Sequence, residues 1–187
     1  MESFLGRADR LIIGGALAFP FLRAHGAELG ATPTEGGLEA AVEAFLHRSE
    51  ASSTEVTLPA DLVVEPSGGG GASVMPADRL APGSVAKDIG PASRAAFAAA
   101  LAGSKTVFWN GPLGLAEDPR FAAGTSEVLG RLASIPGYHV AAGGDSARVA
   151  ESLGVIGAFG FVSTGGGAAL EFVQGLDLPG LAVLPDA

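Results

Sequence analysis

The sequence predicts an α/β fold in which helices cover both faces of a doubly wound, mostly parallel sheet, with residues 1–187 forming a single domain. Short apolar runs that are typical of buried strands alternate with segments that favour helix. Three of these runs end in glycine-containing turns, within residues 109–112, 140–146 and 161–167. In a parallel sheet, such turns lie beyond the carboxyl ends of the strands, where ligands bind. The predicted architecture is therefore three-layered and Rossmann-like.

The composition excludes several classes of protein. The chain has 187 residues, 48% of them hydrophobic, which is enough for one substantial core. It has no cysteine, so disulfide frameworks and thiolate metal sites are excluded. A net charge of −9 argues against a nucleic-acid partner. No apolar run approaches the ~20 residues of a membrane span, and the first residues lack a signal-peptide pattern, so we expect a cytoplasmic protein with no membrane partner.

The first half of the chain predicts three strands and two helices. Strands are expected at residues 11–13, 55–59 and 61–64, and helices at 16–24 and 34–49. Pro20 fits the first of these helices only if it lies in the first turn. The glycine tract at residues 67–73 is expected to be a flexible loop rather than a phosphate site, because it does not join a strand to a helix.

The second half predicts a regular alternation of helices and strands. Helices are expected from Pro91 through residue 101 and at 121–133, 145–153 and 168–174. Strands are expected at residues 106–109, 138–141 and 159–162, with Trp109 in the core. His25, His47 and His139 show no spacing that suggests a metal site or a catalytic base, so we place them on the surface or in loops.

The turns at residues 140–146 and 161–167 suit an anion. A strand that ends in glycines and opens a helix presents backbone N–H groups and a positive helix end to a phosphate. Asp145 could cap its helix or hold a metal ion, and the pattern of residues alone favours the cap. The chain has only two lysines, Lys87 and Lys105, and neither lies in a glycine-rich turn. Backbone dipoles, a metal ion or cations from elsewhere must therefore neutralise a bound phosphate.

Five segments, in order and near-spacing, resemble the C-terminal half of phosphoglycerate kinase. They are residues 11–19 (LIIGGALAF), 88–91 (DIGP), 109–112 (WNGP), 143–146 (GGDS) and 163–168 (STGGGA), and residues 178–180 (LPG) resemble the tail of that family. The resemblance covers nearly the whole chain. It implies a domain that binds ATP or ADP with Mg²⁺ and that belongs to an enzyme transferring phosphoryl between ATP and 3-phosphoglycerate in glycolysis.

The resemblance also implies roles for individual residues. Those near the base and ribose would be Gly14, Gly15 and Ala16 at the adenine, Asn110, Gly111, Leu113 and Leu115 along the cleft, and Glu117 at the ribose hydroxyls. Those near the phosphates would be Gly143, Gly144 and Ser146, with Asp145 binding Mg²⁺. Gly165, Gly166 and Gly167, together with Gly144, would offer N–H groups to the phosphoryl group in transfer. From the residues alone, Glu117 could equally be a solvated loop carboxylate and Asn110 a turn residue.

The chain departs from the family pattern at several places. Ala16, Ala86 and Ala142 stand where the family has glycine, and the glycine tract replaces a family loop. The half that binds 3-phosphoglycerate and the lysines that contact the nucleotide phosphates are expected to be missing. We therefore keep two alternatives open: a stand-alone module that binds adenine nucleotide without catalysis, and a truncated fragment without function.

The resemblance also predicts a gap in the sheet. In the strand order 3-2-1-4-5-6, residues 11–13 would be strand 2 and residues 106–109 strand 4, and the first strand would be missing between them. Unpaired N–H and C=O groups at two inner edges are costly. We expect either a direct ladder between these two strands, or self-association in which another chain donates a strand.

Overall fold

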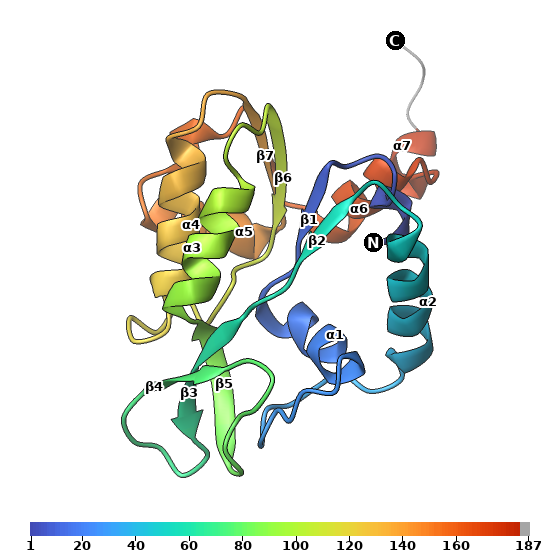
Figure 1. The fold of residues 1–187 in the computed structure, drawn as a ribbon. Coiled ribbons are helices and arrows are strands. Elements are labelled where there is room, and N and C mark those ends of the chain that lie inside the picture. Colours follow the sequence, from blue (N-terminus) through green and yellow to red (C-terminus); the bar gives the residue numbers. More distant parts are fainter. Residues whose placement is uncertain (184–187) are drawn as a thin grey trace. The chain divides into compact units, whose positions relative to one another are not determined.

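The computed structural model describes residues 1–183 and confirms the α/β class (Figure 1). Its strands lie in a two-stranded parallel sheet, a three-stranded antiparallel sheet and a three-stranded parallel sheet. The chain forms two compact units. The first contains residues 1–102 and 112–132, and the second contains residues 103–111 and the described residues from Ala133 onward. The assignment of residues 1–187 to one domain stays a prediction.

The first unit contains a parallel pair of strands. Strand β1 (Arg10–Ile12) pairs with β2 (Glu55–Thr57), and helices α1 (Ala18–Ala24) and α2 (Glu39–Glu50) pack beside them. Short 3₁₀ turns, η1 (Glu2–Phe4) and η2 (Gly15–Leu17), precede β1 and α1. Phe21 of α1 and Phe45 of α2 are buried and meet edge to face, with ring centroids 5.3 Å apart. Such pairs add stability beyond the burial of their area.

The helix predicted at residues 34–49 begins later than expected, at Glu39. Gly36 and Gly37 precede it, and Gly37 has a φ of +80°, a left-handed conformation that interrupts a right-handed helix. The helix predicted at 16–24 begins as the η2 turn, and its α-helical part starts at Ala18. Pro20 is therefore in the first helical turn, as its missing N–H requires.

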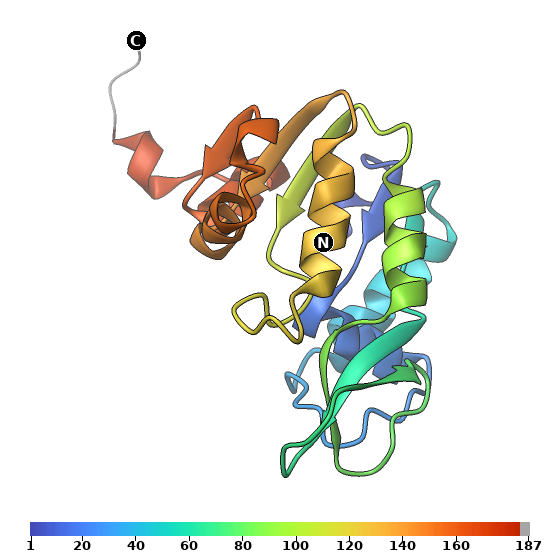
Figure 2. The same cartoon turned by 90° about the vertical axis from the view of Figure 1, so that its left-hand side faces the viewer.

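An antiparallel sheet that the sequence did not predict follows in the same unit. Strand β3 (Asp61–Pro66) pairs with β4 (Ser73–Pro76) on one side and with β5 (Ser84–Ile89) on the other. The glycine tract forms the connection from β3 to β4. Strand β5 runs directly into α3 (Pro91–Ala100), as Figure 2 shows in green.

Helix α3 is held at both ends by groups from elsewhere in the first unit. At its start, the Asp61 carboxylate accepts N–H bonds from Ala92 at 3.0 Å and Ser93 at 2.7 Å, and the Ser93 hydroxyl donates to it at 2.7 Å. At its end, the Arg10 guanidinium donates to the carbonyls of residues 100 and 102. Helix α4 (Ala123–Ala133) completes the unit and buries Leu129.

The second unit is a parallel sheet with helices packed against it. Strands β6 (Thr106–Asn110), β7 (Tyr138–Ala142) and β8 (Phe161–Ser163) lie in that order. Helices α5 (Gly144–Ser152) and α6 (Gly166–Gln174) pack against β7, and a 3₁₀ turn, η3 (Ile156–Ala158), precedes β8. A short helix, α7 (Pro179–Ala182), follows. The buried residues include four alanines, so this core is built from small side chains, as the composition predicts: Ala141, Ala142, Ala147 and Ala150.

Two aromatic residues of the second unit lie in its interior to different extents. The expected position of His139 was wrong, because this residue is 2% exposed on β7 and its Nε2 lies 2.9 Å from the carbonyl oxygen of Ile135. Trp109 is half-buried against Phe159, with centroids 5.8 Å apart. Among the residues that the structure describes, no helix is long and apolar enough to cross a membrane.

The parallel strands follow the predicted order within their sheets. Strand β1 lies beside β2, which matches positions 2 and 3 of a doubly wound sheet, and β6, β7 and β8 match positions 4, 5 and 6. The direct ladder between residues 11–13 and 106–109 is not observed within residues 1–183, where β1 and β6 are edges of separate sheets. Strand donation or self-association at these edges stays a prediction.

Removal of the Asp61 carboxylate is expected to destabilise the chain in a pH-dependent manner. Burial alone would raise the pKa of Asp61, but the bonds from Ser93 and Ala92 and the charge of Arg94 hold this pKa below its ordinary value of 3.8. A lowered native-state pKa stabilises the fold above pH 3.8, and this contribution is lost as the pH falls through the native value. Asp61→Ala should lower the free energy of unfolding at pH 7 by about 1 kcal/mol, as loss of a helix cap does.

Urea unfolding at pH 7 and at progressively lower pH measures this effect, with the exposed Asp78→Ala as a control. The difference between Asp61→Ala and the unmodified chain should shrink in acid. A difference that stays constant from pH 7 to acid would contradict the role given to the carboxylate.

Within residues 1–183, β1 and β6 are edge strands of their sheets, and we expect the chain to self-associate and to be marginally stable as a monomer. Edge strands offer free N–H and C=O groups to another chain. Sedimentation over a range of concentrations, combined with thermal melting, measures both properties. A monomer at all concentrations that melts cooperatively above ~65 °C, beyond the usual mesophile range, would contradict this expectation.

Candidate functional site

The carboxyl ends of the three parallel strands meet at one edge of the second unit. The register places Asn110 of β6 beside Ala142 of β7, and Ala142 beside Ser163 of β8. The turns that follow these strands therefore start at the same level. They carry the residues that we call the strand-edge cluster: Asn110, Gly111, Gly143, Gly144, Asp145, Ser146, Gly165, Gly166 and Gly167.

The strand-edge cluster is tied together by the backbone and by one hydroxyl. The Gly143 N–H donates to the carbonyl of Ser163 at 2.8 Å. The Gly111 N–H donates to the hydroxyl of Ser146 at 2.7 Å, and Ser146 is 1% exposed. These bonds fix the turns after β6, β7 and β8 to one another. The sequence-predicted residues of this cluster are thus brought together within one unit.

Glycine is required where two turns of the cluster touch. Gly143 has a φ of +100°, which side chains disfavour. A Cβ atom on Gly166 would lie 3.1 Å from the Cα of Gly143 and 3.4 Å from Oδ1 of Asn110. A side chain at Gly166 would press on the start of α5, and one at Gly143 would be strained by its φ and would crowd Oδ1 of Asn110. The backbone is therefore bare at the point where the two helices begin.

The electrostatic character of this edge is set by two helix N-termini. Helices α5 and α6 have 9 residues each, and no side chain caps either N-terminus. The first N–H groups of a helix carry a partial positive charge equivalent to roughly half a charge, and they attract anions. The edge is therefore suited to an oxyanion such as a phosphate group.

The remaining predicted site residues lie in the first unit. We call them the loop cluster: Gly14, Gly15, Ala16, Leu113, Leu115 and Glu117. A Cβ atom on Gly14 would lie 2.5 Å from Cδ2 of Leu113, and one on Gly15 would lie 2.8 Å from the carbonyl oxygen of Pro112. The turn after β1 therefore packs against the start of the loop at residues 112–122. Ala16, Leu115 and Glu117 are exposed.

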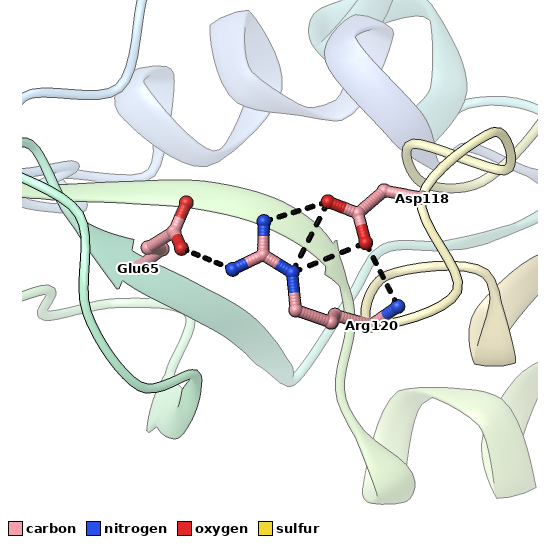
Figure 3. A network of polar contacts seen from close by, with 3 residues as sticks. All are labelled: Glu65, Asp118 and Arg120. Carbon is pink, nitrogen blue, oxygen red and sulfur yellow. Dashed lines mark hydrogen bonds and ion pairs between the residues drawn. The ribbon is translucent and has the colours of Figure 1, made fainter.

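The loop at residues 112–122 is anchored by an ion-pair network (Figure 3). Arg120 donates to Glu65 of β3 at 2.6 Å and to Asp118 at 2.7 Å. The bonds from Arg120 hold the pKa of Asp118 below its ordinary value, and the bonds to Asp118 and Glu65 raise the pKa of Arg120. The guanidinium also lies 4.8 Å from the ring centre of Phe121. Glu117 thus belongs to a loop that is tied to the antiparallel sheet.

The sequence matches a known family over nearly its whole length. A family model of phosphoglycerate kinase matches residues 1–176. The chain belongs to the phosphoglycerate kinase family.

Relatives and solved structures of phosphoglycerate kinase agree with this assignment. The chain is 41% identical over 194 residues to phosphoglycerate kinase from Streptomyces coelicolor, covering 100% of this chain and 48% of that protein. It is 46% identical over 187 residues to the enzyme from Thermus thermophilus, covering 98% and 48%. A structure of phosphoglycerate kinase from Coxiella burnetii superposes with a TM-score of 0.87 at 32% identity, covering 94% of this chain and 46% of that one. The chain spans about half the length of these phosphoglycerate kinases.

The structure adds to the strand-edge cluster a cation that the sequence analysis missed. Arg148, in the first turns of α5, forms an ion pair with Asp145, and both side chains are largely exposed. The expectation about cations rested on lysines within the turns. The i,i+3 spacing of Asp145 and Arg148 on a predicted helix was the available signal.

Asp145 stands apart from other potential metal ligands. Among residues 1–183, no group of three or more His, Cys, Asp or Glu side chains is arranged to hold a metal ion. Mg²⁺ is usually bound by one or two carboxylates together with substrate phosphates and water, rather than by a complete protein cage. A single exposed carboxylate beside an edge suited to an anion fits this pattern.

Proposed function

We propose that the chain is the nucleotide-binding part of a phosphoglycerate kinase. It binds ATP or ADP with Mg²⁺ and, as part of a complete enzyme, serves phosphoryl transfer between ATP and 3-phosphoglycerate in glycolysis, in the cytoplasm. The observation that carries the proposal is the convergence of Asn110, Gly143 and Gly166 at the carboxyl edge of the parallel sheet. Two uncapped helix N-termini begin at that convergence.

Each cluster would take a different part of the nucleotide. The phosphates would bind at the strand-edge cluster, where N–H groups of Gly144, Gly166 and Gly167 stabilise negative charge without a covalent step. The base would bind against Gly14, Gly15 and Ala16, with Leu113 and Leu115 beside it. Glu117, in the anchored loop, would accept hydrogen bonds from the ribose hydroxyls.

Asp145 would hold Mg²⁺ together with the nucleotide phosphates. The metal would supply positive charge against the phosphate oxygens when bound. In the chain alone, the partner of Asp145 is the guanidinium of Arg148. Metal binding would release that guanidinium, which could then face the phosphates from the first turns of α5.

Two alternatives are separated from this proposal by direct assays. A stand-alone module would bind MgADP but would give no kinase activity even when the remaining half of a phosphoglycerate kinase is supplied. A fragment without function would give no heat on calorimetric titration with MgADP. Recovery of 3-phosphoglycerate kinase activity on addition of the other half would support the proposal over both.

The substitution Asp145→Ala is expected to abolish the dependence of ADP binding on magnesium. In the unmodified chain, excess chelator should weaken ADP binding by about tenfold or more, because the metal supplies most of the charge that neutralises the phosphates. Calorimetric titrations with Mg²⁺ and with chelator measure this difference.

Glu151→Ala, an exposed carboxylate on the same helix, is the matched control and should retain the metal dependence. Equal ADP affinity of the unmodified chain with Mg²⁺ and with chelator would contradict the role proposed for Asp145.

The chain alone is expected to give no measurable turnover of 3-phosphoglycerate. Holding two substrates in reactive geometry supplies effective concentrations of up to roughly 10⁵–10⁸ M, and this advantage is lost without a surface for the acceptor. A coupled assay on the 187-residue chain, purified from a host that lacks its own phosphoglycerate kinase, measures the activity. Turnover that persists through such a purification would contradict the expectation.

A further inference from the structure

One buried carboxylate of the first unit is not explained by the residue roles given above. Asp88, near the end of β5, is 3% exposed. Its Oδ2 accepts the N–H of Gly124 at 2.7 Å, and its Oδ1 accepts the N–H of Ile89 at 2.8 Å. A buried carboxylate is costly unless its charge is matched by donors. Here one of the donors comes from the start of α4, directly after the loop at residues 112–122.

Two glycines, one near the start of that loop and one just after its end, lie directly against this carboxylate. A Cβ atom on Gly114 would lie 2.2 Å from Oδ1 of Asp88, and a Cβ atom on Gly124 would lie at the same distance from it. These distances are shorter than any real contact between such atoms. The start and the end of the loop therefore both close directly on the Asp88 side chain.

Two further bonds hold the start of the loop in the same region. The Leu115 N–H donates to the carbonyl of Lys87 at 2.9 Å, next to Asp88 in β5. The Leu113 N–H donates to the hydroxyl of Thr125 at 2.9 Å, next to Gly124 in α4. Asp88 lies between these anchors, because it bonds to α4 and is itself part of β5. Leu113 in turn packs against Gly14.

We propose that Asp88 is a positioning residue that fixes the loop at residues 112–122 and so holds Leu113, Leu115 and Glu117 in place for the adenosine part of a nucleotide. Asp88 touches no ligand in this account and acts through the loop. The proposal rests on the function proposed above only for the identity of the ligand. The anchoring itself depends on contacts within the first unit.

The chemistry of the site requires a carboxylate. Two N–H donors point at its two oxygen atoms, and an ionised carboxylate accepts from both. An asparagine of the same shape would turn an NH₂ group toward one of these donors. Burial raises the pKa of Asp88, against the effect of the bonds from Gly124 and Ile89 and of the charge of Arg94. The other charged group near it is Glu127, which raises this pKa further and pairs with Arg94 at 2.8 Å.

The test compares Asp88→Asn with Asp61→Asn in the 187-residue chain. Asp61 is the matched control, because it also accepts backbone N–H bonds, but from Ala92 and Ser93 in α3 rather than from α4 or the loop. Amide hydrogen exchange is followed at Leu113, Leu115 and Gly124, thermal melting reports global stability, and MgADP titration reports affinity.

For Asp88→Asn, hydrogen exchange at the three amides should increase by more than the loss of global stability, measured by melting, explains. ADP affinity should fall by about tenfold, which is the effect of one charge-assisted hydrogen bond. Asp61→Asn should lower the melting temperature. Once exchange rates are corrected for this loss of stability, the three amides should exchange as in the unmodified chain, and ADP affinity should be unchanged. The proposal would be overturned if the loss of global stability fully explains the faster amide exchange in Asp88→Asn. It would also be overturned if both variants increase exchange at the three amides equally. If the unmodified chain binds no ADP, the proposed function fails, while the exchange comparison still decides the anchoring.

A measurement on the unmodified chain covers the case in which Asp88→Asn does not fold. The amide signals of Gly124 and Leu115 are followed by NMR as the pH is lowered. Both should move together, with a midpoint above the ordinary aspartate pKa of 3.8 and before global unfolding. If the Gly124 signal does not move before the chain unfolds, or moves without Leu115, the carboxylate does not control the loop and the proposal is overturned.

Discussion

The proposed phosphate site depends on a close contact between two segments of bare backbone. A Cβ atom on Gly166 would crowd the Cα of Gly143, and the positive φ of Gly143 disfavours a side chain there. The parallel register brings the two strand ends level, and the bond from Gly143 to Ser163 joins the turns. Because no side chain caps the N-terminus of α5 or α6, the first N–H groups of these helices are suited to an anion. The same contact thus fixes the packing of the second unit and creates its candidate site.

This constraint also shapes the electrostatics of an otherwise acidic chain. With a net charge of −9, the protein repels phosphates at long range. Oriented backbone N–H groups attract them at short range without adding a formal charge. The pairing of Arg148 with Asp145 gives the same turn of α5 one cation and one potential metal ligand. Exchange of that guanidinium for Mg²⁺ would couple metal binding to the charge that faces the nucleotide.

In the first unit, the loop cluster depends on contacts that hold an irregular loop in a fixed position. The loop at residues 112–122 has turn bonds of its own, such as the one from the Phe121 N–H to the carbonyl of Asp118, but its position depends on neighbouring elements. Here a buried carboxylate, a carbonyl of β5 and the Arg120 ion-pair network supply the anchors. Residues that would touch the base and ribose therefore depend on residues that would touch no ligand.

The sequence predicted the parts of the fold that depend on local residue patterns. Apolar runs ending in glycine predicted β1, β6, β7 and the start of α5, and the family motifs predicted which turns would gather. The antiparallel sheet was missed because β4 is mostly exposed and its pairing with β3 depends on distant residues. Asp88 entered the sequence analysis only as part of the motif at residues 88–91, since nothing local shows that it is buried. His139 was misplaced for the same reason, and Arg148 was overlooked because ion pairing depends on side-chain conformation.

The most direct test of the account is an NMR titration of the isotope-labelled chain with MgADP. We expect the amide signals of Gly144, Gly166 and Gly167 to shift in a saturable manner, because their N–H groups would face the phosphates. Adenosine without phosphates should leave these signals unchanged and shift those of Gly14 and Leu113. Saturable binding of MgADP that moves no signal at the carboxyl edge of β6, β7 and β8 would contradict the central claim.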